Sequence, residues 1–328
     1  MKHVSILIPN GHTSLVNIEG THQILSEVNN LRTSMGKAPL FDIQMVGLSK
    51  ETSQREGLFT IKPDCLYTDV AKTDLIIIPA IHGQFTKTVA ANQALIPWIL
   101  QQFNSGAEVA SLCIGSFFLA ATGLLKGKQC ATHWRFANEF RALYPDVELV
   151  DDKIITDGDG IYTSGGAYAY LNLLVYMIEK YAGREIAILI AKAFMIDIDR
   201  TLQSPFIIFQ GQKSHEDETV KKAQAYIEKN FEEKITVDQI AGTFALGRRS
   251  LERRFKKATC NTVTEYIQRV KIEAAKKDLE TGQKNVYEVM YDVGYSDVKA
   301  FRSIFKKITG LSPVEYRNKY NKELLVMD

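Results

Sequence analysis

Short apolar runs alternate with amphipathic segments over the first two thirds of the chain. The runs at 4–8 and 75–78 each end at a proline and have the length and β-branched content of buried strands. Segments such as 20–30 and 167–181 instead carry apolar residues at helical spacing. Strands separated by helices form βαβ units, so this part predicts an α/β fold with a mainly parallel sheet sandwiched by helices.

The pattern changes near residue 200. Residues 201–218 contain proline, glycine and a polar run, which is typical of a linker. Beyond them apolar residues recur at helical spacing, and proline is absent until Pro313. We therefore predict an α/β domain at 1–200 and an all-α domain at 219–328, joined by the linker at 201–218.

The all-α part repeats itself at an interval of 50 residues. Residues 255–257 and 305–307 both read Phe-Lys-Lys, and Glu265 and Glu315 are each followed by tyrosine. A repeat of this length is usually one supersecondary unit used twice. Each copy has the pattern of a helix, a tight turn and a second helix, so the domain is predicted to hold two helix-turn-helix motifs.

In each copy the second helix has an apolar stripe and a cationic face. The two copies lie at 237–258 and 287–308, and Asp297 is a good N-cap for the second helix of the later copy. Long basic side chains on such a helix reach phosphates in a major groove, and arginine binds guanine edges. The predicted DNA-binding residues are Arg248, Arg249, Arg253, Lys256, Lys257, Lys299, Arg302, Ser303, Lys306 and Lys307.

The distribution of charge agrees with a nucleic-acid partner. Residues 219–328 hold 22 Lys and Arg against 15 Asp and Glu, a net charge of +7, whereas residues 1–218 carry −5. A basic tail on an acidic body suggests that the tail meets a polyanion. A solvated helical surface, or a helical module that binds other proteins, is the alternative.

The all-α part resembles the DNA-binding domain of the AraC/XylS family of bacterial transcription regulators over about residues 219–320. The second unit carries this resemblance in Val293-Gly294-Tyr295-Ser296-Asp297, Phe305-Lys306-Lys307 and Thr309-Gly310-Leu311-Ser312-Pro313. The resemblance implies two helix-turn-helix motifs joined by a long helix. The first unit departs from the family at Cys260, where Cys-Asn-Thr-Val replaces Gly-x-Ser-Pro, so the form of its closing turn stays open.

A cysteine directly follows the strand predicted at 108–112. Cys113 therefore occupies a sharp strand-to-helix corner, a cysteine version of the nucleophile elbow. The N-terminus of the following helix favours a thiolate, which predicts a reactive thiol. The alternative is a buried structural cysteine, since Cys is among the most buried residue types.

The surroundings of Cys113 resemble the ThiJ/PfpI-like proteins, which share the flavodoxin-like fold of class I glutamine amidotransferases. The stretches Leu112-Cys113-Ile114-Gly115 and Ala131-Thr132-His133-Trp134 carry the most specific part of this resemblance. Through it we expect a ligand pocket lined by Asn17, Glu19, His82, Gly83, Cys113, Ile114, His133 and Gly165.

Two departures from these enzymes argue against catalysis. Asn17 stands where the family's enzymes place an acidic side chain, and Ile114 stands where the peptidase-like members place histidine. An amide cannot act as a base as a carboxylate can. We therefore predict that the protein is not an enzyme and that Cys113 is at most a vestigial catalytic residue.

Together these patterns predict a sequence-specific transcription regulator. Its expected partners are double-stranded promoter DNA, a second copy bound through the N-terminal domain, and a small-molecule effector. Four scattered cysteines without a CxxC pair, and the absence of a long apolar run, favour a cytoplasmic protein without a structural metal or other cofactor. The alternative function is a cysteine-dependent hydrolase or amidase of the ThiJ/PfpI type that carries a DNA-targeting tail.

Overall fold

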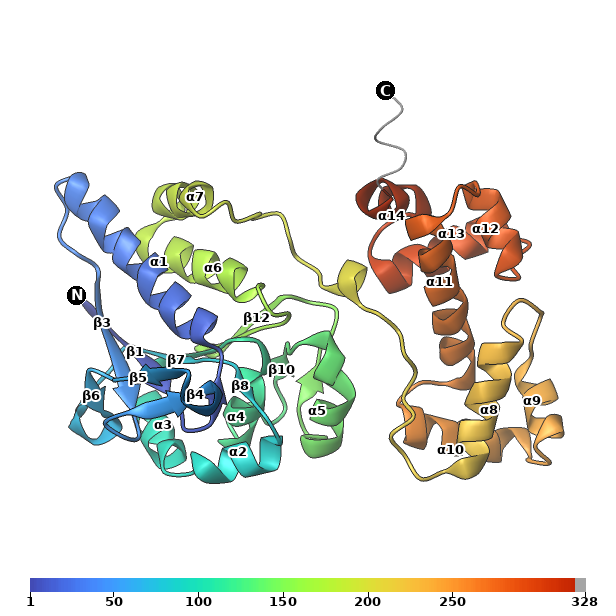
Figure 1. Ribbon diagram of the computed structural model, residues 1–328, viewed down its shortest axis with the longest axis horizontal. Coiled ribbons are helices and arrows are strands. Elements are labelled where there is room, and N and C mark those ends of the chain that lie inside the picture. Colours follow the sequence, from blue (N-terminus) through green and yellow to red (C-terminus); the bar gives the residue numbers. More distant parts are fainter. Residues whose placement is uncertain (322–328) are drawn as a thin grey trace. The chain divides into compact units, whose positions relative to one another are not determined.

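A seven-stranded sheet forms the centre of the N-terminal unit (Figure 1). Its strands lie in the order β12-β13-β9-β7-β1-β3-β6, and each neighbouring pair is parallel except β12 and β13. The mainly parallel sheet expected from the sequence is thus confirmed. The strand bounds are β1 (Lys2–Ile8), β3 (Phe41–Gly47), β6 (Cys65–Leu66), β7 (Leu75–Ile78), β9 (Glu108–Ser111), β12 (Ile155–Gly158) and β13 (Ile161–Ser164).

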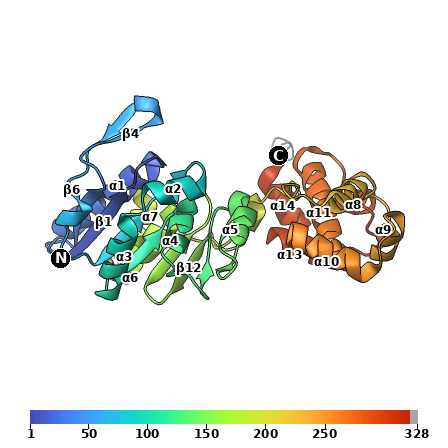
Figure 2. The ribbon, with the colours of Figure 1, turned by 90° about the horizontal axis from the view of Figure 1, so that it is seen from below.

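Helices cover both faces of this sheet (Figure 1, Figure 2). One face carries α1 (Leu15–Ser34), α6 (Tyr170–Ala182) and α7 (Arg184–Ala193). The opposite face carries α2 (Phe85–Ala91), α3 (Leu95–Asn104), α4 (Ser116–Ala121) and α5 (Ala137–Leu143). This arrangement confirms the predicted α/β sandwich.

The strands are buried on both faces and supply two separate cores. Along β1, Val4 and Ile6 pack with α1, α6 and α7, whereas Leu7 belongs to the core beneath α2, α3 and α4. Successive side chains of a strand point to opposite faces, so a continuous apolar run serves both layers.

Three short ladders surround the main sheet. They pair β2 (His12–Thr13) with β8 (Ile81–His82), β4 (Thr52–Gln54) with β5 (Phe59–Ile61), and β10 (Gln129–Cys130) with β11 (Glu148–Leu149). The β4–β5 hairpin turns through the 3₁₀ segment η1 (Arg55–Gly57) and stands out from the sheet (Figure 2). Strands of two or three residues carry too little periodicity to be predicted from the sequence.

The structure describes residues 1–321, and the chain divides into the units Met1–Gln203 and Ser204–Asp328. The α-helices described in the second unit are α8 (Glu218–Lys229), α9 (Val237–Thr243), α10 (Arg248–Thr259), α11 (Val263–Thr281), α12 (Val286–Asp292), α13 (Val298–Thr309) and α14 (Pro313–Tyr320). Residues of α11 contribute to two cores, one with α8, α9 and α10 and one with α12, α13 and α14 (Figure 1). Across residues 1–321, no helix has both the length and the apolarity to cross a membrane.

The segment before α8, which we name the strap (residues 204–217), packs on the helical unit. The buried ammonium of Lys276 donates to the carbonyl oxygen of Ile207, and the Phe209 amide donates to Glu273 at 3.1 Å. The Phe209 ring lies edge-on to Tyr266 with centroids 5.1 Å apart. The strap is therefore ordered against α11.

Candidate nucleic-acid interface and ligand site

Helices α9 and α10 form the first helix-turn-helix unit. A capping box between Thr236 and Gln239 begins α9, and Ala245 takes a φ of 50° in the turn that follows it. On α10, Leu251 and Phe255 are fully buried, as the sequence predicted. The opposite face of α10 is left to solvent.

Helices α12 and α13 form the second unit, with Gly294 in the turn. Gly294 has a φ of 72°, and a Cβ there would overlap the Glu232 carbonyl oxygen and the Lys271 ammonium. Only glycine combines this dihedral angle with so close an approach. The Asp297 side chain accepts the Ala300 amide at 2.8 Å, which confirms the predicted N-cap of α13.

A buried lysine holds the turn of the second unit. Lys271 is 6% exposed, and its ammonium donates to the carbonyl oxygens of Val293 at 2.8 Å and Glu233 at 3.1 Å. Burial lowers the pKa of Lys271 from its ordinary value. The sequence analysis missed this residue, although a lysine four positions after Ile267 on the apolar stripe of α11 was a usable signal.

Both units close with the same turn. The Thr259 hydroxyl donates to the Phe255 carbonyl at 2.8 Å and accepts the Asn261 amide at 3.1 Å, and Thr309 makes the equivalent bonds one repeat later. Cys260 takes a φ of 57° where Gly310 takes 75°. The turn that the sequence left open is thus a left-handed cap made without glycine.

All ten predicted DNA-binding side chains are exposed on α10 and α13. Two of them are already engaged: Arg248 pairs with Asp238 and Glu252, and Lys256 donates to the Cys260 carbonyl. The remaining cations form no ion pair within residues 1–321, namely Arg249, Arg253, Lys257, Lys299, Arg302, Lys306 and Lys307. Unpaired cations on a helix face are available to phosphates and base edges.

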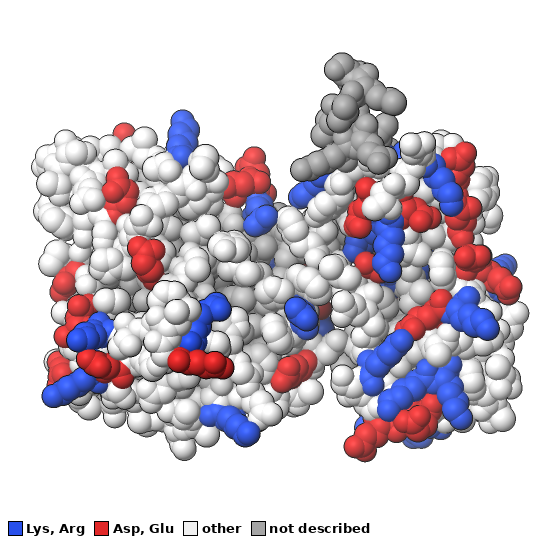
Figure 3. Space-filling model, in the orientation of Figure 1, with Lys and Arg blue, Asp and Glu red and all other residues white. Residues whose placement is uncertain are grey.

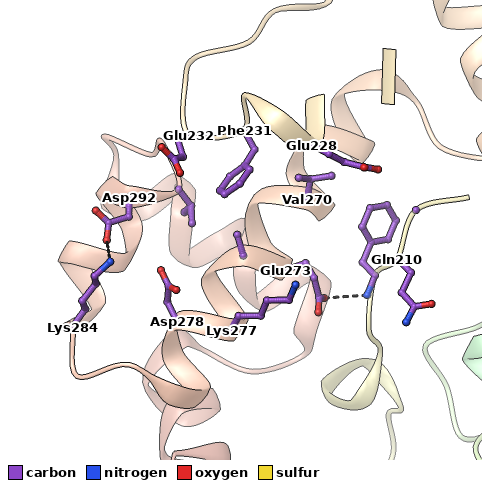
Figure 4. Close-up of a pocket in the computed structure, with 14 residues that line it drawn as sticks. Gln210, Glu228, Phe231, Glu232, Val270, Glu273, Lys277, Asp278, Lys284 and Asp292 are labelled. Atoms are coloured by element: carbon purple, nitrogen blue, oxygen red, sulfur yellow. Dashed lines mark hydrogen bonds and ion pairs between the residues drawn. The ribbon is translucent and has the colours of Figure 1, made fainter. Parts of the chain in front are cut away.

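An acidic cavity of about 690 Å³ lies on another side of the helical unit (Figure 4). Its lining is net negative, with the carboxylates of Glu228, Glu232, Glu273, Asp278 and Asp292 against the ammonium groups of Lys277 and Lys284. None of the ten predicted DNA-binding residues lines it. Carboxylates repel phosphates, so this side is unsuited to DNA. Figure 3 shows Lys and Arg gathered, with some Asp and Glu, over the lower part of the helical unit.

Cys113 begins the 3₁₀ turn η3 (Cys113–Gly115) at the end of β9, with a φ of 55°. The elbow predicted from the sequence is therefore present, and the Cys113 amide donates to the Ser164 hydroxyl at 3.1 Å. Burial raises the pKa of the Cys113 thiol to about 12, which favours the buried structural cysteine over the expected thiolate. The following helix α4 has only six residues, and its small dipole does not offset the burial.

Asn17 and Glu19 point to different sides of α1. Asn17 is 2% exposed, and its side-chain oxygen accepts the Ala80 amide at 3.1 Å. This bond ties α1 to the loop after β7, which gives Asn17 a structural role. Glu19 is exposed to solvent, and Ile114 is buried in the core beneath α2 and α4.

The two predicted histidines lie within electrostatic reach of each other. Partial burial lowers the pKa of His82, with further lowering from the positive charges of His12 and Arg55. Burial is also the main cause of the lowered pKa of His133, to which Arg135 and His82 contribute. Both rings are therefore held toward their neutral forms.

The two predicted glycines differ in their surroundings. Gly83 is exposed with a φ of 117°. Beside Gly165 the space is filled by Gln203, whose amide nitrogen donates to the Thr132 carbonyl at 2.8 Å and whose oxygen accepts the Trp134 amide at 3.2 Å. Gly165 thus makes room for an internal glutamine.

His82 also lines a cavity of about 610 Å³ at the β2–β8 ladder. The cavity walls include His12, Arg55 and Phe59, which the sequence analysis did not single out. These residues lie in or beside the short strands that periodicity does not reveal. Within residues 1–321, no group of three or more His, Cys, Asp or Glu could hold a metal ion.

Comparison with known proteins identifies two families along the chain. The DJ-1/PfpI family matches residues 25–180, and a helix-turn-helix domain matches residues 240–319. The HTH-type transcriptional regulator ArgR of Pseudomonas aeruginosa is 28% identical over 230 residues, which cover 70% of this chain and 70% of that protein. The HTH-type transcriptional regulator GbdR of the same species is 24% identical over 258 residues, which cover 78% and 69%.

Solved structures agree with the fold. A putative transcriptional regulator from Vibrio parahaemolyticus has a TM-score of 0.53 and 22% identity, and the match covers 59% of this chain and 98% of that one. An AraC family transcriptional regulator from Pseudomonas putida has a TM-score of 0.50 and 14% identity, over 59% and 100%. The chain therefore joins a DJ-1/PfpI-family domain to a helix-turn-helix domain of the AraC type, and this is the composition of a DNA-binding transcription regulator.

Proposed function

We propose that this protein regulates transcription by placing α10 and α13 in successive major grooves of promoter DNA. The repeated surface carries the proposal: each helix buries phenylalanine at the same place in the repeat and exposes, on the other side, cations that pair with no carboxylate of the described chain. Two such helices on one protein read one face of the duplex in grooves about 10 bp apart. Because its target is promoter DNA, its proposed place of action is the cytoplasm.

Within this interface we assign different tasks to the exposed cations. Arg249 and Arg302, near the starts of α10 and α13, are our candidates for reading bases, because the N-terminal residues of a recognition helix contact base edges. Lys257, Lys306 and Lys307 are candidates for phosphate contacts. The Arg248 side chain is held between α9 and α10 by Asp238 and Glu252, so its first role is to fix the angle of that motif.

Selection of bound sites from random duplexes with the full chain tests this function. We expect one bipartite site whose two halves lie about 10 bp apart. Affinity should fall with salt at a log–log slope near −0.9 for each phosphate contacted. If the chain binds duplex DNA without preferring any site and without salt dependence, the proposed DNA-binding function is wrong.

The N-terminal domain has two proposed tasks, dimerisation and the sensing of a small molecule. The similar proteins ArgR and GbdR are named as transcriptional regulators, and the cavity beside His82 offers a site for an effector. A dimer would present two DNA-binding domains to one promoter and raise affinity through effective concentration. Sedimentation of the full chain and of the helical unit alone would measure the oligomeric state of each and show whether the N-terminal domain is needed for the dimer.

Catalysis has no place in this proposal. The thiol of Cys113 is buried with a pKa of about 12, and Asn17 supplies an amide bonded to Ala80 where the resemblance calls for an acid. The hydrolase alternative requires a thiolate and a proton acceptor beside it. Turnover of amides, peptides or aldehydes that disappears in Cys113→Ser would restore that alternative.

A further inference from the structure

One end of the cavity at the β2–β8 ladder carries the positive charge of Arg55 and the imidazoles of two histidines. His12 and His82 face each other as a cross-strand pair, and Arg55 of η1 lines the same cavity. The effect of His12 and Arg55 on the pKa of His82 shows that the three groups share one electrostatic environment. No acidic side chain is among the described residues that line the cavity, and Arg55 forms no ion pair within residues 1–321.

The N-terminus of α1 opens on the same cavity. Ser14 is the N-cap of this 20-residue helix, yet its side chain makes no capping bond, and the first turn contains no acidic residue. The Ser14 amide is fixed by the Ala80 carbonyl at 2.8 Å, so the helix start is held in place. Helix geometry leaves the first amides of α1 without an intrahelical acceptor, and the helix dipole favours an anion there.

A buried donor without a partner lies next to this helix start. The Gln54 side chain is 1% exposed, and its oxygen accepts the amide of Thr13, a cavity residue, at 2.9 Å. Its amide nitrogen is buried and has no hydrogen-bond partner within residues 1–321, and the same holds for the hydroxyl of nearby Thr52. Neither side chain lines the cavity, so Gln54 supports the site only through its bond to Thr13, which it holds in the cavity wall.

The remaining wall of the cavity is apolar. Leu58 and Phe59 of the β4–β5 hairpin line it together with Val16 of α1, and all three are exposed, at 72%, 47% and 50%. Apolar side chains on a rim beside this charged end suit an amphipathic molecule. A bare inorganic anion would leave this wall uncovered.

We propose that this cavity binds a small organic acid, with its carboxylate at the α1 N-terminus among His12, His82 and Arg55 and its apolar body against Leu58 and Phe59. The inference rests on the effector-sensing part of the proposed function and names the class of effector. It also places the effector beside the ladder rather than on the buried thiol of Cys113.

Calorimetric titration of the full chain at pH 7 tests the ligand class. The probes are benzoate and hexanoate, their uncharged counterparts benzamide and hexanamide, and inorganic phosphate. We expect each acid to bind at least about tenfold more tightly than its amide, and more tightly than phosphate. Equal affinity of acid and amide, or phosphate binding as tight as benzoate, overturns the proposal.

Variants locate the site. Arg55→Gln should weaken benzoate binding about tenfold, whereas Lys72→Gln removes an equal charge from the exposed surface and should leave it unchanged. Ser14→Asp introduces a carboxylate at the N-terminus of α1, where the carboxylate of the ligand is proposed to bind. It should raise the thermal midpoint while abolishing benzoate binding. Unchanged affinity in both Arg55→Gln and Ser14→Asp overturns the assigned site.

The same preparations are tested for binding to the selected DNA site. If benzoate and hexanoate fail to bind while DNA binding is intact, the organic-acid inference falls and the DNA-binding function stands. If the wild-type chain fails to bind DNA, the proposed function falls whatever the acids do. The two failures are thus separate.

Discussion

At the scale of single residues, the backbone is held in the left-handed region at several functional corners. Cys113, Ala245 and Cys260 all have φ values from 50° to 57° without being glycine. Such positions cost conformational energy that the surrounding packing must offset. Ala245 and Cys260 lie in the turn and at the end of the first helix-turn-helix unit, which the proposed function uses, whereas Cys113 lies at the elbow after β9.

Gly294→Ala tests the recognition turn of the second unit. The new Cβ would require a positive φ and would overlap the Glu232 carbonyl and the Lys271 ammonium, so we expect a loss of at least about 2 kcal/mol in the free energy of unfolding. Gly247→Ala is the matched control, because Gly247 has a φ of −69° and open space around its Cα. It should lower the free energy of unfolding by no more than about 1 kcal/mol, the cost of replacing the N-cap glycine of α10 with alanine. Urea unfolding measures both, and equal effects would contradict the tight turn.

Thiol labelling tests the environment of Cys113. Because burial raises its pKa to about 12, the thiolate fraction at pH 8 is negligible and labelling should stay slow until the pH approaches that value. Exposed Cys260 should label first, and Cys260→Ser should remove this fast phase. Mass spectrometry of labelled peptides gives each rate. Labelling of Cys113 at pH 8 as fast as that of Cys260 would restore the reactive elbow.

At the scale of elements, much of the helical unit could be predicted from the sequence. The 50-residue repeat indicated both motifs, the buried stripe of α10 and α13, and the cap at Asp297. The helix expected directly after Cys113 is in fact η3 followed by the short α4, because Gly123 takes a φ of 83° soon after Ala121. The sequence did not reveal the β2–β8 ladder or the Gln203 insertion beside Gly165, because each joins residues that are distant in sequence.

Arg249→Ala and Arg302→Ala test the two recognition helices. If each arginine reads a base, each change should weaken binding to the selected site by about 1–3 kcal/mol and relax preference at one position. Lys87→Ala, on exposed α2 of the other unit, removes the same charge and should leave site preference unchanged. Competition assays with base-substituted duplexes give the result. Unaltered preference in both arginine variants would show that other residues read the bases.

The pairing of the strap with α10 should make stability depend on pH. Arg254 binds Asp217 through two bonds of 2.6 and 2.8 Å and, as the main cause, holds the pKa of Asp217 at about 2. A depressed folded pKa means that the stabilisation is complete above the unfolded value of about 3.9 and is lost as the pH falls through about 2. Asp217→Asn keeps the cap of α8 but removes the charge. Its deficit in urea midpoint should be full at pH 6 and shrink between pH 4 and 2.

Glu233→Gln controls for this titration, since its exposed side chain has no partner of this kind in the described chain. Its urea midpoint should follow that of the wild type over the same pH range. A deficit in Asp217→Asn that stays constant from pH 6 to pH 2 would show that the carboxylate charge does not contribute.

At the scale of the whole molecule, residues 204–217 of the linker predicted at 201–218 belong to the helical unit. The side chains of Lys276 and Glu273 are 4% and 14% exposed. They hydrogen-bond to the backbone of the strap at Ile207 and Phe209. A polar run without periodicity gave no sign of this, because the bonds come from backbone groups that any sequence possesses. The strap thereby attaches the start of the helical unit to α11, which packs with both DNA-binding motifs.

Two fragments test this role, one with residues 204–328 and one with residues 219–328. The shorter fragment leaves Lys276 without the Ile207 carbonyl and Arg254 without Asp217, so its urea midpoint should be lower. Both fragments should show salt-dependent binding to the selected DNA site with the same slope, because both retain α10 and α13. The full chain should bind more tightly than either, since a dimer raises the effective concentration of the second domain. Equal midpoints would show that the strap adds nothing to the fold, and equal affinity of the full chain and the longer fragment would contradict dimeric binding.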